Sequence, residues 1–216
     1  MSEVLATEDS EEVPANVPYE IVPGDISAYL SALSAGNVPD NAPAADFTKI
    51  EGKFVGTTYQ TLRWGACKWG LDELMQQAQA YVESEWSQSR RSEGDTYGIM
   101  QIKDSAGYFS MVVPFERESM PFNVDFQNGW IRSCVNADMS GYFKPLNSPV
   151  TGCPHYGVNE MSSSCPLYED GISATQQQYL GCVGAWYSGR WYDTAAVAYI
   201  QAVQKTAEQQ PWRRDH

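Results

Sequence analysis

Apolar residues recur at helical spacing through most of the chain after residue 54. Over 70–86 they form a single stripe of six side chains: Leu71, Leu74, Met75, Ala78, Val82 and Trp86. This i, i+3, i+4, i+7 pattern predicts an amphipathic helix with one buried face. Similar stripes predict helices over 123–135, over 174–187 and after Asp193. Alternating patterns typical of strands are scarce, with one short candidate over 97–102, so we expect a mainly α domain with a small strand region.

The first 48 residues differ in composition from the rest of the chain. They hold nine of the 27 acidic residues and five of the 12 prolines. We therefore expect an acidic N-terminal extension over 1–48, partly disordered or lying as a strap, and a folded domain over 49–216. Within the extension, Asp25 is typical of an N-cap and predicts a short helix over 26–35.

Charge and hydropathy exclude several function classes. The net charge is −13, whereas binding of nucleic acid phosphates needs clustered Lys and Arg. No run of apolar residues approaches the roughly 18 that a membrane span requires. The chain has only two histidines, one of them at the C-terminus, which argues against a His-based metal site. We expect neither a nucleic acid partner nor a membrane span, and no metal.

The chain has five cysteines, without a CxxC pair or a Cys/His cluster that would indicate zinc. A cytosolic protein could bury five thiols, whereas an exported one would pair four and leave one over. Cys153 and Cys165 flank a Pro-, Gly- and Ser-rich stretch over 152–166, which would gain most from a cross-link. No signal peptide is visible in the first 25 residues, so export would mean that Met1 stands in place of a removed signal. Disulfides would favour a secreted, periplasmic or cell-wall location.

Glu83 lies at the edge of the apolar stripe, one residue after Val82. A carboxyl at the boundary between core and surface is partly desolvated, which raises its pKa and lets it remain protonated near neutral pH. That is the property of a general acid. The alternative is an ordinary solvated helix residue.

The residues that follow Glu83 favour the general acid. Glu83 is followed directly by Ser84, then by Ser92 nine residues after Glu83, and by the block Gly-Ile-Met-Gln-Ile over 98–102. Together with the segment Gly-Ala-Trp-Tyr-Ser-Gly over 184–189, this resembles the signature of the lytic transglycosylase and goose-type lysozyme group, glycoside hydrolase family 23. The resemblance runs over about 57–204, with Ile99 in place of the usual leucine. It implies a lysozyme-like α+β domain.

The resemblance also implies a reaction. Glu83 would protonate the oxygen of a β-1,4 bond between N-acetylmuramic acid and N-acetylglucosamine in peptidoglycan. As a base it would then take the proton of the sugar's own C6 hydroxyl, which attacks C1 and leaves a 1,6-anhydro end, so no cofactor is needed. Ser92 would contact the substrate, and Met100 and Gln101 would line the cleft. Tyr187 would hydrogen-bond the catalytic glutamate.

Other positions leave the outcome of the reaction open. Tyr199 matches a tyrosine of the closing helix of the family. Hydrolytic members of the family hold a water molecule with two acidic residues. Asp95 matches the first of these positions. At the second position this chain has Lys103, and Asp104 follows one residue later. Both aspartates could equally form turns.

Three functions therefore remain: a lytic transglycosylase, a family 23 hydrolase acting on peptidoglycan or chitin, and a non-catalytic module that binds glycan or protein. The net negative charge slightly favours neutral chitin over anionic peptidoglycan. Many aromatic residues follow Asp95, and Tyr97 and Trp191 are the candidates for stacking on a sugar ring.

Overall fold

The computed structural model describes residues 47–103, 112, 115–136, 138–139, 147–158 and 160–213. The helix expected over 26–35 lies outside the described residues, as does nearly all of the extension. The main helices are α3 (Thr58–Trp69), α4 (Glu73–Ser84), α5 (Phe115–Glu118), α6 (Met120–Val135), α8 (Ala174–Ser188) and α9 (Thr194–Gln209). A three-stranded antiparallel sheet has the order β1 (Arg91–Ser92), β2 (Thr96–Tyr97) and β3 (Ile102–Lys103). The prediction of a mainly α domain with a small strand region is confirmed.

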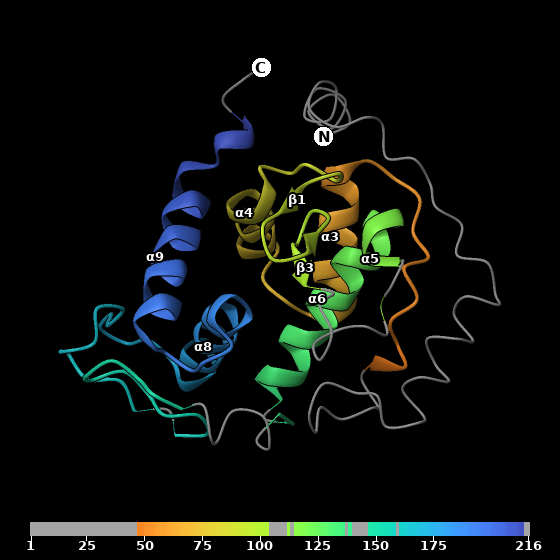
Figure 1. Cartoon of the computed structure of the whole chain (residues 1–216). Helices are drawn as coiled ribbons and strands as arrows, with labels where there is room; N and C mark the ends of the chain where they lie inside the picture. The colour runs from red at the N-terminus through yellow and green to blue at the C-terminus, as the bar shows by residue number, and fades with distance from the viewer. Residues whose placement is uncertain are drawn as a thin grey trace.

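The helices pack in two groups with α4 between them. In Figure 1, α8 and α9 form one flank of the molecule, and α3, α5 and α6 form the other. Helix α4 contacts both α3 and α9, and α6 contacts α8. Almost every residue of α6 is buried, which makes this helix the centre of the core.

The boundaries of α4 follow from its caps. The Asp72 side chain accepts a hydrogen bond from the backbone N–H of Met75, so the helix begins at Glu73, not at residue 70 as predicted. Glu85 and Trp86 have φ angles of 55° and 62°, which end the helix at Ser84. The sequence prediction for 70–86 was therefore right in type and too long at both ends.

The segment predicted as one strand over 97–102 is two strand ends joined by a tight turn. Gly98 has a φ of 77° and lies against Asn123 of α6, where a Cβ would collide with the amide. The Asn123 side chain accepts from the backbone N–H of Met100 at 2.8 Å and donates to the carbonyl of Tyr97 at 3.0 Å. The turn is therefore held on α6 by a single buried amide.

Two disulfides reinforce the domain, as expected for the exported form of such a chain. Cys134–Cys182 joins α6 to α8, and Cys153–Cys165 closes the loop that was predicted to gain most from a cross-link. The fifth cysteine, Cys67, is unpaired and exposed on α3.

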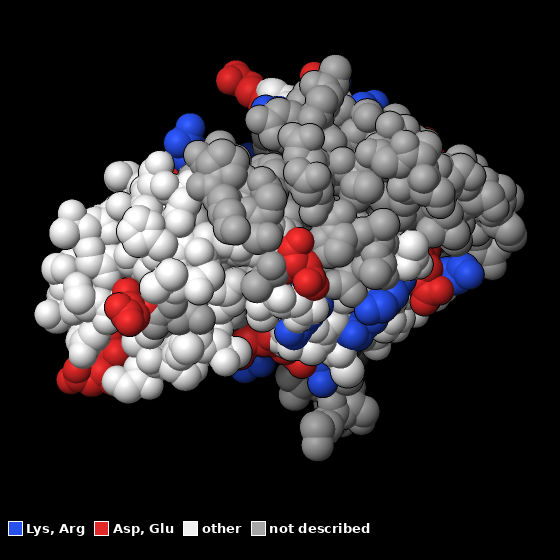
Figure 2. Space-filling view, turned by 90° about the horizontal axis from the view of Figure 1, so that it is seen from below, with Lys and Arg blue, Asp and Glu red and all other residues white. Residues whose placement is uncertain are grey.

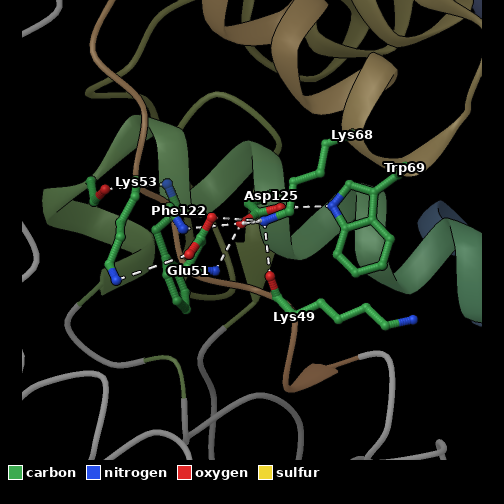
Figure 3. Close-up of polar contacts among 9 residues, drawn as sticks. Lys49, Glu51, Lys53, Lys68, Trp69, Phe122 and Asp125 are labelled. Carbon is green, nitrogen blue, oxygen red and sulfur yellow. Dashed lines mark hydrogen bonds and ion pairs between the residues drawn. The ribbon is translucent and has the colours of Figure 1, made fainter.

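A buried carboxylate anchors the segment that precedes α3 (Figure 3). Asp125 on α6 is fully buried and accepts hydrogen bonds from the backbone N–H groups of Glu51 and Gly52, at 2.8 and 3.0 Å. It also accepts from the indole of Trp69 at 2.6 Å and pairs with the Lys68 ammonium at 2.7 Å. Four donors from two segments therefore converge on one side chain.

Phe47 lies at the start of the described residues and packs into the hydrophobic core. Phe47 is fully buried, and its ring packs against Phe126 with centroids 5.6 Å apart. Phe47, which the prediction placed in the extension, therefore contributes to the core of the folded domain.

The described surface shows no single dominant charged patch in the view of Figure 2. Lys and Arg side chains there lie beside Asp and Glu, and a broad area is uncharged. Within the described residues, no helix has the length and apolar character needed to cross a membrane.

Candidate active site

Glu83 lies in the last turn of α4 and faces a cleft of about 700 Å³. The walls of the cleft come from four parts of the fold: α4, the β1–β3 sheet, Trp130 of α6, and the end of α8. The cleft therefore forms where the two groups of helices meet the small sheet.

Ser84 explains why the cleft forms next to Glu83. Its hydroxyl is buried and donates either to the carbonyl of Ala80 at 3.1 Å or to that of Ile99 at 2.9 Å. The second contact fastens the end of α4 to the turn over 98–101. The pairing of glutamate with serine thus places the acid beside the wall made by the sheet.

The Glu83 carboxyl has the electrostatics of a general acid. Burial raises its pKa from the usual 4.5 to about 7, and hydrogen bonds from Tyr199 and Trp186 lower it only in part. At neutral pH the group is therefore divided between its protonated and ionised forms. A carboxyl in that state can both donate and accept a proton.

Tyr199 is the partner of Glu83. Tyr199 lies on α9, and its hydroxyl donates a hydrogen bond of 2.5 Å to Glu83 Oε1. Burial and the neighbouring Glu83 charge raise the pKa of Tyr199 well above 10, so the phenol stays protonated and remains a donor. The resemblance had implied this role for Tyr187, and that assignment is corrected. Tyr187 instead stacks on Tyr199, with ring centroids 4.8 Å apart and planes 5° from parallel.

Ser92 and Gln101, two of the expected substrate-binding residues, do line the cleft. The Gln101 amide donates to the carbonyls of Gly98 at 2.7 Å and Arg90 at 3.2 Å, and its oxygen accepts from the Thr96 hydroxyl at 3.1 Å. Gln101 therefore braces the turn and presents only a small part of its surface to the cleft.

Two expected site residues are core residues instead. The Met100 side chain is fully buried, and the backbone carbonyl of Met100 accepts a hydrogen bond of 3.3 Å from the Trp186 indole. Trp191 is also fully buried and packs edge-on against Tyr156, with ring centroids 4.8 Å apart. The prediction that Trp191 stacks on a sugar is corrected, because no face of its ring is open.

Asp95 and Tyr97 lie outside the cleft. Asp95 is at the tip of the β1–β2 hairpin, half exposed, and pairs with Arg91 at 3.2 Å. The Tyr97 ring is covered by two guanidinium groups, those of Arg117 at 4.0 Å and Arg91 at 5.2 Å from its centroid. The structure therefore gives neither residue the position that was expected. Asp104 lies outside the described residues.

Among the cleft-lining residues that the sequence interpretation did not assign to the site are Glu93, Lys103, Trp186 and Arg190. Trp186 precedes Tyr187 in the segment over 184–189, and Glu93 follows Ser92 directly. Their proximity to expected residues was the available signal. The roles of these side chains depend on which way each one points, and that is decided by tertiary packing.

Within the described residues, no group of three or more His, Cys, Asp or Glu side chains is arranged to hold a metal ion. The charged and hydroxyl groups of the cleft include one partly buried carboxyl, Glu83, one exposed carboxylate, Glu93, and two cations, Lys103 and Arg190. This set can transfer protons and bind polar or anionic ligands.

Comparisons of the chain with protein-family models, with curated proteins and with solved structures gave no match.

Proposed function

We propose that the protein cleaves the β-1,4 bond between N-acetylmuramic acid and N-acetylglucosamine in peptidoglycan, as a lytic transglycosylase. The observation that carries the proposal is the Glu83 carboxyl, which has a pKa of about 7 and lies in an open cleft with the Tyr199 hydroxyl bound to it. The family resemblance of the surrounding motifs supports the same reaction.

The chemistry needs one group that gives a proton and takes one back. Protonated Glu83 donates to the glycosidic oxygen while the C1–O bond breaks through an oxocarbenium-like state. Ionised Glu83 then removes the proton of the C6 hydroxyl, whose oxygen attacks C1 and closes the 1,6-anhydro ring. The proton returns to Glu83, so the cycle needs neither water nor a cofactor. A pKa near 7 suits both steps.

The cations of the cleft favour an anionic glycan over neutral chitin. Lys103 and Arg190 both line the cleft, on the sheet side and at the end of α8. Muramic acid carries a lactyl group, and its peptide or free carboxylate would be attracted by these cations. These two cations exceed the one exposed carboxylate of the cleft, Glu93, and they act at shorter range than the overall net charge of −13, which is screened by salt.

A hydrolase is the second candidate, because Glu93 also lines the cleft. A second carboxylate on the wall opposite an acid can activate a water molecule in an inverting glycosidase. The matched aspartate, Asp95, is turned away to Arg91, so the role of base would fall to Glu93.

The two disulfides support export. Such bonds form and persist in oxidising compartments, where peptidoglycan is also found.

The test is mass spectrometry of the soluble products from purified peptidoglycan, with Glu83→Gln and Glu93→Gln as the variants. Anhydro-ended products from the wild type and from Glu93→Gln, but not from Glu83→Gln, would support the transglycosylase. Reducing-end products that depend on Glu93 would establish the hydrolase. Equal binding of glycan by wild type and Glu83→Gln, without products from either, would indicate a non-catalytic binding module.

A further inference from the structure

Tyr187 is the most exposed aromatic side chain at the cleft. Its exposed fraction is 60%, and it lies among the lining residues of the cleft that holds Glu83. Tyr187 makes no side-chain hydrogen bond within the described residues. Its ring contact with Tyr199 uses one face. A large exposed ring at a functional cleft needs a reason.

The ring is nevertheless held in a fixed orientation. One face stacks flat on buried Tyr199, with planes 5° apart, and this leaves the other face open. The backbone beneath it is also fixed. Gly189 ends α8 in the left-handed conformation, and the Ser188 hydroxyl accepts from the backbone N–H of Arg190 at 3.0 Å.

We infer that the open face of Tyr187 is a stacking platform for a hexopyranose ring of the substrate, adjacent to the bond that Glu83 protonates. The inference rests on the proposed function and deepens it. The C–H groups on one side of a pyranose form an apolar face that packs on an aromatic ring. Because the ring is already oriented by Tyr199, little conformational entropy is lost on binding.

The position of Tyr187 also links binding of the sugar to the Glu83 carboxyl. Tyr187 covers Tyr199, and Tyr199 donates to Glu83. A sugar on the outer face would extend this stack and exclude water from the side of the cleft nearest the acid.

The test uses the full chain carrying Glu83→Gln, which would bind glycan without cleaving it. Calorimetry with a tetrasaccharide of alternating N-acetylglucosamine and N-acetylmuramic acid gives the reference Kd. Adding Tyr187→Leu should weaken binding about tenfold, whereas Tyr187→Phe, which keeps the ring, should stay within about twofold. Tyr168→Leu is the matched control, since Tyr168 is 39% exposed and does not line the cleft.

A second measurement distinguishes sugar binding by Tyr187 from a structural role in which Tyr187 only holds Tyr199 in place. In the otherwise active enzyme, Tyr187→Leu should raise KM and leave the alkaline limb of the pH profile of kcat/KM in place. If Tyr187→Leu leaves Kd unchanged, or leaves KM unchanged while the alkaline limb of kcat/KM shifts, Tyr187 is not a stacking platform. The proposed function would still stand. If the Glu83→Gln parent binds no tetrasaccharide while its melting temperature is normal, the proposed function falls as well.

Discussion

The hydroxyl of Tyr199 and the carboxyl of Glu83 are 2.5 Å apart, although the two residues are separated by 116 positions in the chain. The contact joins the end of α4 to α9. It fixes the orientation of the carboxyl and supplies a donor to its charged form. The hydrogen bond therefore opposes the effect of burial on the Glu83 pKa.

Tyr199→Phe should move the pH dependence of activity. Removing this donor leaves only the Trp186 hydrogen bond to oppose burial, so the pKa of Glu83 rises above its present value of about 7. Because Glu83 must be protonated to act as the acid, the alkaline limb of kcat/KM should shift to higher pH. We also expect kcat to fall by about 10- to 100-fold from the loss of orientation. Rates on peptidoglycan between pH 5 and 9 check both effects, and an unmoved limb would contradict the role of Tyr199.

Glu83 should also make stability depend on pH. Its pKa rises from 4.5 in the unfolded chain to about 7 in the folded one, so the folded state binds the proton more tightly. This contribution to the free energy of unfolding is fully present below pH 4.5 and is lost as pH rises through 7. It amounts to about 3 kcal/mol at most. Glu83→Gln has no such charge to bury. It should therefore melt above the wild type at pH 8 and show a smaller difference at pH 5. A constant difference across this range would argue against a partly buried carboxyl that titrates near neutral pH.

The local sequence specified the helices better than the site. The helix predicted over 174–187 is found as Ala174–Ser188, because Ser173 and Gln176 form a capping box and Gly189 ends the helix. These signals lie within a few residues of the boundary that they set. Helix α3 was not singled out, although Thr57 and Gln60 form the same kind of box.

The candidate site could be predicted only where local sequence decides the position. Glu83 was singled out because both its place at the edge of an apolar stripe and the motif that follows it are local properties of the sequence. Trp191 was misplaced because an aromatic residue in a loop gives no sign of whether its ring is open or, as here, fully buried. The choice between Tyr187 and Tyr199 depends on how α8 packs on α9, which no local pattern encodes.

Asp125→Ala should destabilise the domain without changing the chemistry. The substitution leaves the Trp69 indole and two backbone N–H groups without their acceptor and removes the shorter of the two ion pairs of Lys68. We expect a loss of about 3–5 kcal/mol in the free energy of unfolding, measured in urea. Asp170→Ala is the matched control, since this aspartate is exposed and should change stability by less than about 0.5 kcal/mol. Activity per folded molecule should stay the same, because Asp125 does not line the cleft.

Phe47→Ala tests whether the segment before α3 belongs to the core. Phe47 is fully buried against Phe126, so removing its ring leaves a cavity that the surrounding side chains fill only in part. We expect a loss of about 3–5 kcal/mol, comparable with that of any central phenylalanine. Thr48→Ala, at an exposed neighbouring position, is the control and should be nearly neutral. Urea unfolding of both variants would decide where the domain begins, since a neutral Phe47→Ala would return the boundary to residue 49.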